Sequence, residues 1–581
     1  MPKQADSKRA RLEAIRTQMV QERESFLPHY RELADYILPN RPRFMVTDAN
    51  RGDRRNNKLN DLTAAFAART LTSGMMSGLT SPARQWFRLT TASPELDEKG
   101  PVKSWLYIVH QRMMMEFSKS DLYNVLPSVY DDLGTFATAA GSIEENFDPQ
   151  GAAFRFNSFP VGSYCLALDA NHRVAVFFRE FRMTVRQVVQ DFAERDSQGR
   201  VADWSNFSPR VRQMYDDGKM GEAVDVCHFI LPNEEYDPER LHAKYKRWAS
   251  IYYEKGQGEG TAERDVYLRE SGFDEFPVFG PRWSVTGEDT YGTNCPGMMA
   301  LGDVKQLQLM QKRKLQAIEK QVNPPMVYPL SMRTVKTSIL PGDNNYVDER
   351  DGAKGIRPAH EVSLDLNHLM LEIQRVQEAI KKAYFADLFL MLADDTRNER
   401  PTAREIDERH EEKLLVLGPV LQQLDLHLLK PIVDNAFRIM EKRGMFPPAP
   451  RELAGVDLKV EFISMMANSQ KLVAIGGLDR LMQTTLNFAT VVPDVLDKLD
   501  MDQVVDTYAD ILSAPPGVVR TDEQVAALRE GKAKAMQQQA QAEQMQAMGK
   551  TVKDLSGASL EGENVLKKLL DQAQAGQLTP Q

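Results

Sequence analysis

The chain has 581 residues, of which 42% are hydrophobic and 27% charged, so most of it can bury a core and disorder as its main state is excluded. Its 73 basic and 82 acidic residues give a net charge of −9, which argues against a protein that coats DNA through overall positive charge and leaves open a few local basic contacts. At roughly 150 residues per domain, this length allows about four domains.

The cysteines and the apolar runs indicate a cellular compartment. The three cysteines lie far apart in sequence and form no CxxC pair, which argues against a disulfide framework or zinc ribbon and suits a reducing cytoplasm. The polar N-terminus is followed by no apolar signal core, and no uncharged apolar run reaches the ~18 residues that a membrane span needs. We therefore expect a soluble intracellular protein without membrane contact.

The first part of the chain is predicted to be helical. Apolar residues recur at helical spacing from residue 7 to 37, and Pro39 ends this pattern. A basic loop at 51–58 follows, which is either a solvated loop or a contact for nucleic acid. Three more helices are expected at about 62–79, 101–117 and 121–140.

The pattern changes between about residues 150 and 285. Short segments rich in aromatic and β-branched residues alternate there with turn residues, as in 173–178 and 223–230. This pattern predicts a β-rich region with a helical insert near 184–193.

Two long helices are predicted next, at 298–322 and 361–393, separated by a segment rich in proline and glycine that starts at Asn323-Pro324-Pro325. The second helix has apolar residues at a strict 3.5-residue period, which requires a partner along its length. This partner is either the rest of an ordinary helical bundle or a wall of helices in an oligomer. The apolar positions are Val362, Leu366, Leu369, Ile373, Val376, Ile380 and Ala383.

The last third of the chain is predicted to be mostly helical. A polar loop at 394–400 precedes a capping box formed by Thr402 and Glu405, which starts a helix that runs to about residue 443. Two Xaa-Pro steps, at Gly418-Pro419 and Lys430-Pro431, should kink this helix. A strand at about 456–463, a helix at about 468–490 and a Gln- and Ala-rich helical tail with a frayed end complete the chain.

The sequence contains no convincing catalytic or metal-binding constellation. Gly549-Lys550-Thr551 lacks the first glycine and the preceding strand of a phosphate-binding loop. The histidines do not pair at metal-ligand spacings, and Gly141-Ser142-Ile143 lacks the closing glycine of a nucleophile elbow. We therefore expect a protein that is not an enzyme and has no cofactor.

Several segments, taken in their order and spacing, resemble the head-to-tail connecting (portal) proteins of short-tailed, podovirus-type bacteriophages. The likeness extends from about residue 7 to about residue 500 and is weaker in the tail after 521. The segments are 26–39, 73–82 with Trp86-Phe87, Tyr291-Gly292, Pro296-Gly297, 303–305, Asn323-Pro324-Pro325 and 402–406.

The resemblance implies an α+β, predominantly helical portal fold that assembles into a ring of about twelve copies around a channel. Its regions are named wing, stem, clip, tunnel loop and crown. They would be the wing at 1–297, which includes the β-rich region 150–285; stem helices at 298–322 and 361–393; the clip at 323–360; the tunnel loop at 394–400; a return into the wing at 401–500; and the crown at 501–581.

The same resemblance implies the partners and the contact residues. The partners are other copies of the chain, double-stranded DNA in the channel, the terminase large subunit, a tail adaptor, and the major capsid and scaffolding proteins. The site would be the capsid vertex of the virion, after assembly in the host cytoplasm. Candidate DNA contacts are Arg397, Asn398 and Arg400; candidate clip contacts are Arg333, Lys336, Arg350 and Lys354.

The sequence alone leaves alternatives open for two loop arginines and for the class of protein. Arg397 and Arg400 either contact DNA or pair with Glu399 or Glu405. The chain as a whole is a structural portal, an enzyme of DNA packaging or processing, or another tail or adaptor component. The apolar positions of the second long helix are expected, in the portal reading, to pack against neighbouring copies.

Overall fold

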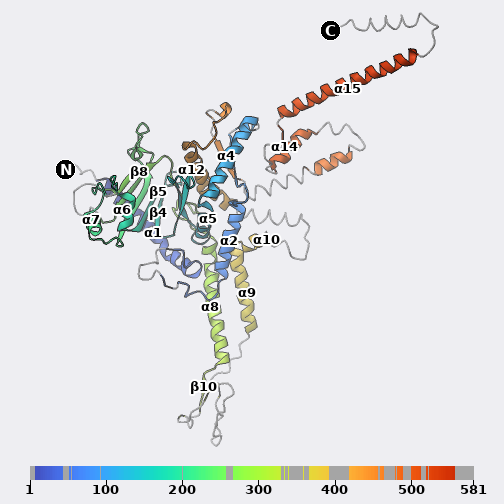
Figure 1. The fold of residues 1–581 in the computed structure, drawn as a ribbon. Helices are drawn as coiled ribbons and strands as arrows, with labels where there is room; N and C mark the ends of the chain where they lie inside the picture. Colours follow the sequence, from blue (N-terminus) through green and yellow to red (C-terminus); the bar gives the residue numbers. More distant parts are fainter. Residues whose placement is uncertain are drawn as a thin grey trace. The chain divides into compact units, whose positions relative to one another are not determined.

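A computed structural model gives the fold of the chain and divides it into two compact units, residues 1–485 and 486–581 (Figure 1). The described residues are 7–42, 52–53, 55–91, 93–97, 99–198, 201–256, 266–328, 333, 338, 357–358, 366–391, 418–453, 455, 458–462, 478, 480–488, 499–511, 519–520 and 522–556. The fold is mixed helix and sheet, as predicted. None of the described helices is both long enough and apolar enough to cross a membrane.

Helices of the first unit surround one large apolar core. This core joins residues from distant parts of the chain, such as Leu33, Leu71, Leu133, Val304 and Ile432, all of which are fully buried. The helices are α1 (Lys8–Tyr36), α2 (Thr63–Leu79), α3 (Pro94–Asp97), α4 (Gly100–Lys119), α5 (Leu122–Phe136), α8 (Pro296–Val322), α9 (Leu366–Ala383), α10 (Ala386–Met391) and α12 (Lys430–Lys442).

The β-rich region contains a five-stranded antiparallel sheet in which each strand pairs with the next along the chain. The helical insert predicted near 184–193 is α6 (Val185–Phe192), and Thr184 and Gln187 form its capping box. A second helix, α7 (Pro209–Asp216), packs beside it. The strands are β4 (Tyr164–Leu168), β5 (Val174–Thr184), β6 (Ala223–Pro232), β7 (Trp248–Glu254) and β8 (Arg269–Phe273).

Smaller sheets tie this region to the helices. Strand β2 (Ala140–Glu145) lies between β3 (Phe154–Phe159) and β9 (Val278–Phe279). Strand β1 (Phe87–Thr91) pairs antiparallel with β12 (Leu458–Phe462), which lies within the predicted strand range. This pairing brings a late segment back to the N-terminal helices. Short 3-10 helices occupy Ala243–Tyr245 and Arg451–Leu453.

Two predicted helices end earlier than expected. The helix predicted over 361–393 is interrupted after Ala383, because Phe385 adopts a left-handed conformation (φ 54°), and α10 starts after it. The helix predicted over 121–140 ends at Phe136, because Ala137 has φ 61° and the chain enters β2. In both places local helix propensity yields to packing of the next element.

The kink predicted at Lys430-Pro431 takes the form of a π-helical turn. Residues Asp425–Leu429 form this turn directly before α12, whose second residue is Pro431. Proline has no backbone donor, so a carbonyl one turn earlier loses its usual partner and the helix widens there.

The second unit contains α14 (Met501–Ile511) and α15 (Asp522–Ser556). The Arg529 guanidinium on α15 donates to both carboxylate oxygens of Asp502 on α14, at 2.6 and 2.8 Å. The described side chains of α15 from Ala526 to Glu543 are all exposed.

Candidate functional site

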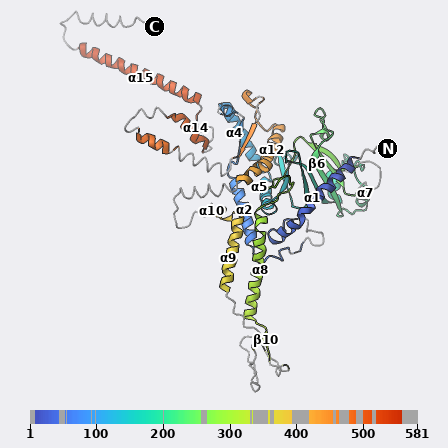
Figure 2. The same ribbon diagram turned by 180° about the vertical axis from the view of Figure 1, so that it is seen from behind.

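The two predicted stem helices, α8 and α9, lie side by side and run in opposite directions (Figures 1 and 2). The first turn of α8 packs tightly on the end of α5: a Cβ atom at Gly297 would lie 2.8 Å from the Thr135 carbonyl oxygen. At its other end, α8 stops at Asn323, before Pro324. The chain then enters a two-stranded pairing of β10 (Met326–Val327) with β11 (Arg357–Pro358).

The apolar face of α9 is covered by the chain itself. Ile373, Val376 and Ile380 are 4%, 7% and 0% exposed and belong to the same core as Val304 and Leu307 of α8. Leu369 and Ala383 are partly buried against this core. The expectation that neighbouring copies cover this face therefore needs correction for Ile373, Val376 and Ile380, and it stays a prediction for the partly exposed Leu369 and Ala383. Periodicity identifies a buried face but not the molecule that buries it.

Val362 lies outside the described residues, and so does the side chain of Leu366. The packing of neighbouring copies against these two positions therefore stays a prediction.

The carboxylate of Asp61 joins α2, α8 and α9. Its Oδ1 atom accepts from the backbone N–H of Thr63, the first residue of α2, at 2.7 Å. Its Oδ2 atom accepts from the Nε2 atoms of Gln311 on α8, at 2.9 Å, and of Gln377 on α9, at 2.8 Å. Burial alone would raise the pKa of Asp61, but these hydrogen bonds outweigh burial and lower it.

A buried glutamine holds the loop that carries Asp61. Gln308 of α8 is 4% exposed; its Oε1 atom accepts from the backbone N–H of Asp61 at 2.9 Å, and its Nε2 atom donates to the carbonyl of Asp61 at 2.8 Å. The loop is therefore hydrogen-bonded to both α8 and α9 at this height.

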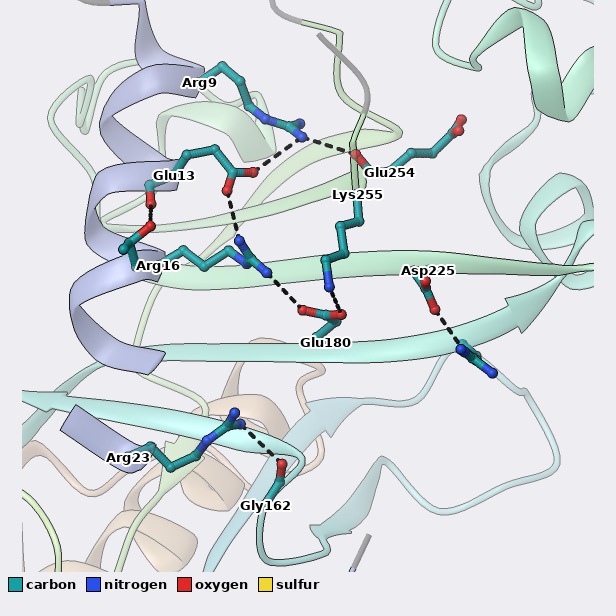
Figure 3. A network of polar contacts seen from close by, with 11 residues as sticks. Arg9, Glu13, Arg16, Arg23, Gly162, Glu180, Asp225, Glu254 and Lys255 are labelled. Carbon is teal, nitrogen blue, oxygen red and sulfur yellow. Dashed lines mark hydrogen bonds and ion pairs between the residues drawn. The ribbon is translucent and has the colours of Figure 1, made fainter. Parts of the chain in front are cut away.

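The N-terminal part of α1 is held on the five-stranded sheet by a network of charges (Figure 3). Arg16 contacts Glu13 at 3.2 Å and Glu180 of β5 at 3.1 Å, and Glu180 also pairs with Lys255. Burial would lower the pKa of Arg16, but its contacts with Glu180 and Glu13 raise it. The guanidinium carbon of Arg9 lies 3.4 Å from the ring centroid of Tyr253.

Apolar side chains lie beneath this charge network. Leu12 and Met19 of α1 pack with Phe178, Phe229 and Ile251 of the sheet. Further along α1, Arg23 donates to the carbonyl of Gly162 at 3.0 Å. The helix thus ties the sheet to the helical core through both apolar and charged contacts.

Comparison with known proteins decides the family. The family of bacteriophage head to tail connecting proteins matches residues 9–519. A portal protein of Salmonella phage epsilon15 is 43% identical over 545 residues, which cover 94% of each chain. A probable portal protein of Bordetella phage BPP-1 is 42% identical over 549 residues, which cover 94% of this chain and 95% of that protein. The chain belongs to this family.

As a portal protein, the chain has a structural role as a head-to-tail connector. The resemblance inferred from the ordered segments is confirmed. Two of those segments have clear packing reasons, because a side chain at Gly292 would clash with Ala137 and one at Gly297 with Thr135. In the part of the chain that the structure describes, no group of three His, Cys, Asp or Glu residues is placed to hold a metal ion.

Most of the predicted contact residues of the portal lie outside the described residues. These are Arg397, Asn398 and Arg400 of the predicted tunnel loop, and Lys336, Arg350 and Lys354 of the predicted clip. Arg333 is described and exposed. The assignment of these side chains to DNA or to partners stays a prediction.

The structure also brings together residues that the sequence analysis did not select. Asp61, Gln308, Gln311 and Gln377 come from three separate segments. Gln308 and Gln311 share the face of α8 that carries Val304 and Leu307. Two glutamines that interrupt an apolar stripe are the sequence pattern that could have indicated a polar contact here.

Proposed function

We propose that the chain forms a closed ring of about twelve copies, with α8 and α9 along a central channel that passes double-stranded DNA. The ring would occupy one vertex of the capsid in the virion, at the junction of head and tail. It would serve genome packaging and later genome ejection, without a cofactor or catalytic step of its own.

The observation that carries this proposal is the arm formed by α8 and α9. The half of the pair nearest β10 has no other described helix or strand beside it (Figures 1 and 2). It nevertheless exposes large apolar side chains, which include Leu315, Val322 and Leu371. Helices of this length gain most of their stability from packing, so such an arm calls for cover from other molecules.

The partners follow from the proposed position. The terminase large subunit would dock during packaging and a tail adaptor afterwards, both on the clip at 323–360. Candidate contacts there are Arg333, Lys336, Arg350 and Lys354. The major capsid and scaffolding proteins would surround the ring during assembly in the host cytoplasm.

The charge of the chain suits a channel through which DNA slides. The net charge of −9 leaves few lasting contacts with phosphates, since each retained Lys or Arg contact strengthens binding. The tunnel loop at 394–400 would supply the few basic contacts. We expect Arg397→Ala with Arg400→Ala to leave ring formation intact and to lower the yield of packaged genomes, measured as encapsidated DNA per particle. An unchanged yield would remove both arginines from the set of DNA contacts.

The ring itself is tested by native mass spectrometry and negative-stain imaging of the purified chain, alone and co-expressed with the scaffolding protein. The expected result is a closed ring with one copy number. A protein that stays monomeric at micromolar concentration under both conditions would contradict the proposal.

A further inference from the structure

Among the described residues, the seam where α8 and α9 meet is covered only along part of its length. The loop around Asp61 and the start of α2 cover it near Gln308, Gln311 and Gln377. Because Gln311 and Gln377 both donate to the same Asp61 oxygen, these two residues mark one height on the antiparallel pair.

Beyond Asp61, toward β10, no other described helix or loop covers the same faces of the two helices, and their large apolar side chains are exposed. Leu315 and Val322 follow Gln308 and Gln311 at helical spacing on α8, and Met370 lies seven residues before Gln377 on α9. Leu315 is 60% exposed, Val322 80% and Met370 45%. We call these three residues the lower groove.

The face of α9 that points away from its buried residues carries a second exposed leucine. Leu371 is 61% exposed, and Gln374 and Glu378 follow it at helical spacing and are also exposed. We call these three residues the outer strip. At ~1.5 Å per residue, Leu371 lies about 9 Å from the height of Asp61, between Leu315 at about 6 Å and Val322 at about 16 Å.

We propose that the outer strip of one copy packs into the lower groove of the next copy, with Leu371 against Leu315, Val322 and Met370. This inference rests on the proposed ring and names the surfaces that close it. A rotation about an axis along the arm keeps these heights, so the groove and the strip meet level with each other. The two surfaces differ, which is the arrangement that builds rings by head-to-tail contact.

Charge complementarity favours the same pairing. Lys312 is exposed on α8 beside the lower groove, and Glu378 ends the outer strip. Lys312 follows Gln311 and Glu378 follows Gln377, the two residues that mark the height of Asp61. Because the helices are antiparallel, the two charges lie on opposite sides of that height and differ from each other by about 3 Å along the arm. Within the described part of the chain, neither residue forms an ion pair. A neighbouring copy would bring the two charges together at the edge of an apolar contact.

The first test places a charge in each surface. Leu315→Asp and Leu371→Asp should each reduce the fraction of chain in rings more than tenfold at the concentration where the wild type is fully assembled. Both leucines are exposed in the single chain, so the far-UV circular dichroism and the unfolding midpoint should not change. The matched control is Leu241→Asp, because Leu241 is fully exposed in the β6–β7 loop; it should assemble normally.

The second test exchanges the charges. Lys312→Glu and Glu378→Lys should each weaken ring assembly several-fold, and the double variant should recover most of the loss. Recovery would show that the two residues meet, which a general effect of surface charge does not produce. Single variants that assemble like the wild type, or a double variant that adds the two losses, would overturn this pairing.

A cysteine pair tests the geometry directly. The three native cysteines are buried, so the double variant Leu315→Cys with Leu371→Cys should form a ladder of covalent oligomers on mild oxidation, while each single variant gives none. Wild-type rings without a ladder, and with unaffected Asp variants, would overturn this interface and leave the portal ring standing. A wild-type chain that never forms rings would instead overturn the proposed function.

Discussion

The five-stranded sheet and the arm made by α8 and α9 both carry rows of apolar side chains, but they are covered in different ways. Helix α1 covers Phe178, Phe229 and Ile251 of the sheet within the same chain, and Arg16 and Glu180 pair at the edge of this contact. The arm buries Ile373 and Val376 within its own chain, but beyond the height of Asp61 it exposes Leu315 and Val322. An apolar stripe therefore shows that burial is required, and only the structure shows whether another copy must supply it.

The largest expected effect is a loss of stability when a charge is placed on the inner face of α9, which carries the buried Ile373, rather than on its outer strip, which carries Leu371. Ile373→Asp places a carboxylate in the apolar core of the chain and should lower the free energy of unfolding by about 4 kcal/mol. Leu371→Asp, two residues earlier and exposed, should change it by less than about 0.5 kcal/mol. Denaturant unfolding of both variants measures this contrast. Equal stability of the two would contradict the assignment of the inner face to the chain's own core.

Removal of the Asp61 carboxylate should loosen the junction at which the arm leaves the core. Asp61→Ala deletes the acceptor of the Thr63 backbone N–H and the acceptor shared by Gln311 and Gln377, at a cost of about 2 to 3 kcal/mol. Hydrogen exchange should become faster in α8 near Gln311 and in α9 near Gln377. Unchanged exchange in both helices would show that the apolar contacts alone fix their spacing.

The π-helical turn should respond to pH. Burial raises the pKa of Asp425 to about 6, above its value in the unfolded chain, so its ionisation opposes folding. The stability that the protonated form contributes is present below about pH 4 and is lost as the pH rises through about 6. Asp425→Asn should therefore stabilise the chain at pH 7 by about 1 to 2 kcal/mol, allowing for the partial exposure of the group.

The comparison for Asp425 is thermal unfolding at pH 4 and pH 7, with the exposed Glu194→Gln as the control. The gain of Asp425→Asn over the wild type should appear at pH 7 and shrink toward pH 4. A gain of the same size at both pH values would rule out ionisation of Asp425 as its cause.

The smallest expected effect lies in the charge network over the sheet. Glu180→Ala removes the partner of both Arg16 and Lys255 and should cost about 0.5 to 1 kcal/mol, because these groups are partly exposed. The loss should shrink at high salt, which screens such pairs. Denaturant midpoints at low and high salt measure it. A larger loss that does not depend on salt would indicate that packing of α1, rather than charge, is disturbed.

Much of the fold could be predicted from the sequence, because the signals are local. The helical spacing of α1, the capping box at Thr184 and Gln187, and the stop of α8 before Pro324 are all short-range patterns. The interruption after Ala383 could not be predicted, since Tyr384 to Met391 continue a helix-compatible apolar run and only the left-handed Phe385 breaks it.

Less of the candidate site could be predicted from the sequence, because its contacts join residues that are far apart in the chain. Strand β1 is short and its partner β12 comes much later in the chain, so β1 is missing from the predicted elements. The glutamines that bind Asp61 look like solvent-facing residues until three distant segments meet. The 3.5-residue period of α9 is real, but its inner face belongs to the chain's own core.

A reconstruction of the purified particle, viewed along its symmetry axis, tests the central claim most directly. The account predicts one ring of chains in which the α8–α9 arms of neighbouring copies touch around a central opening, with Leu371 of one copy over Leu315 of the next. Arms separated by solvent, or an opening lined by other elements of the chain, would contradict it.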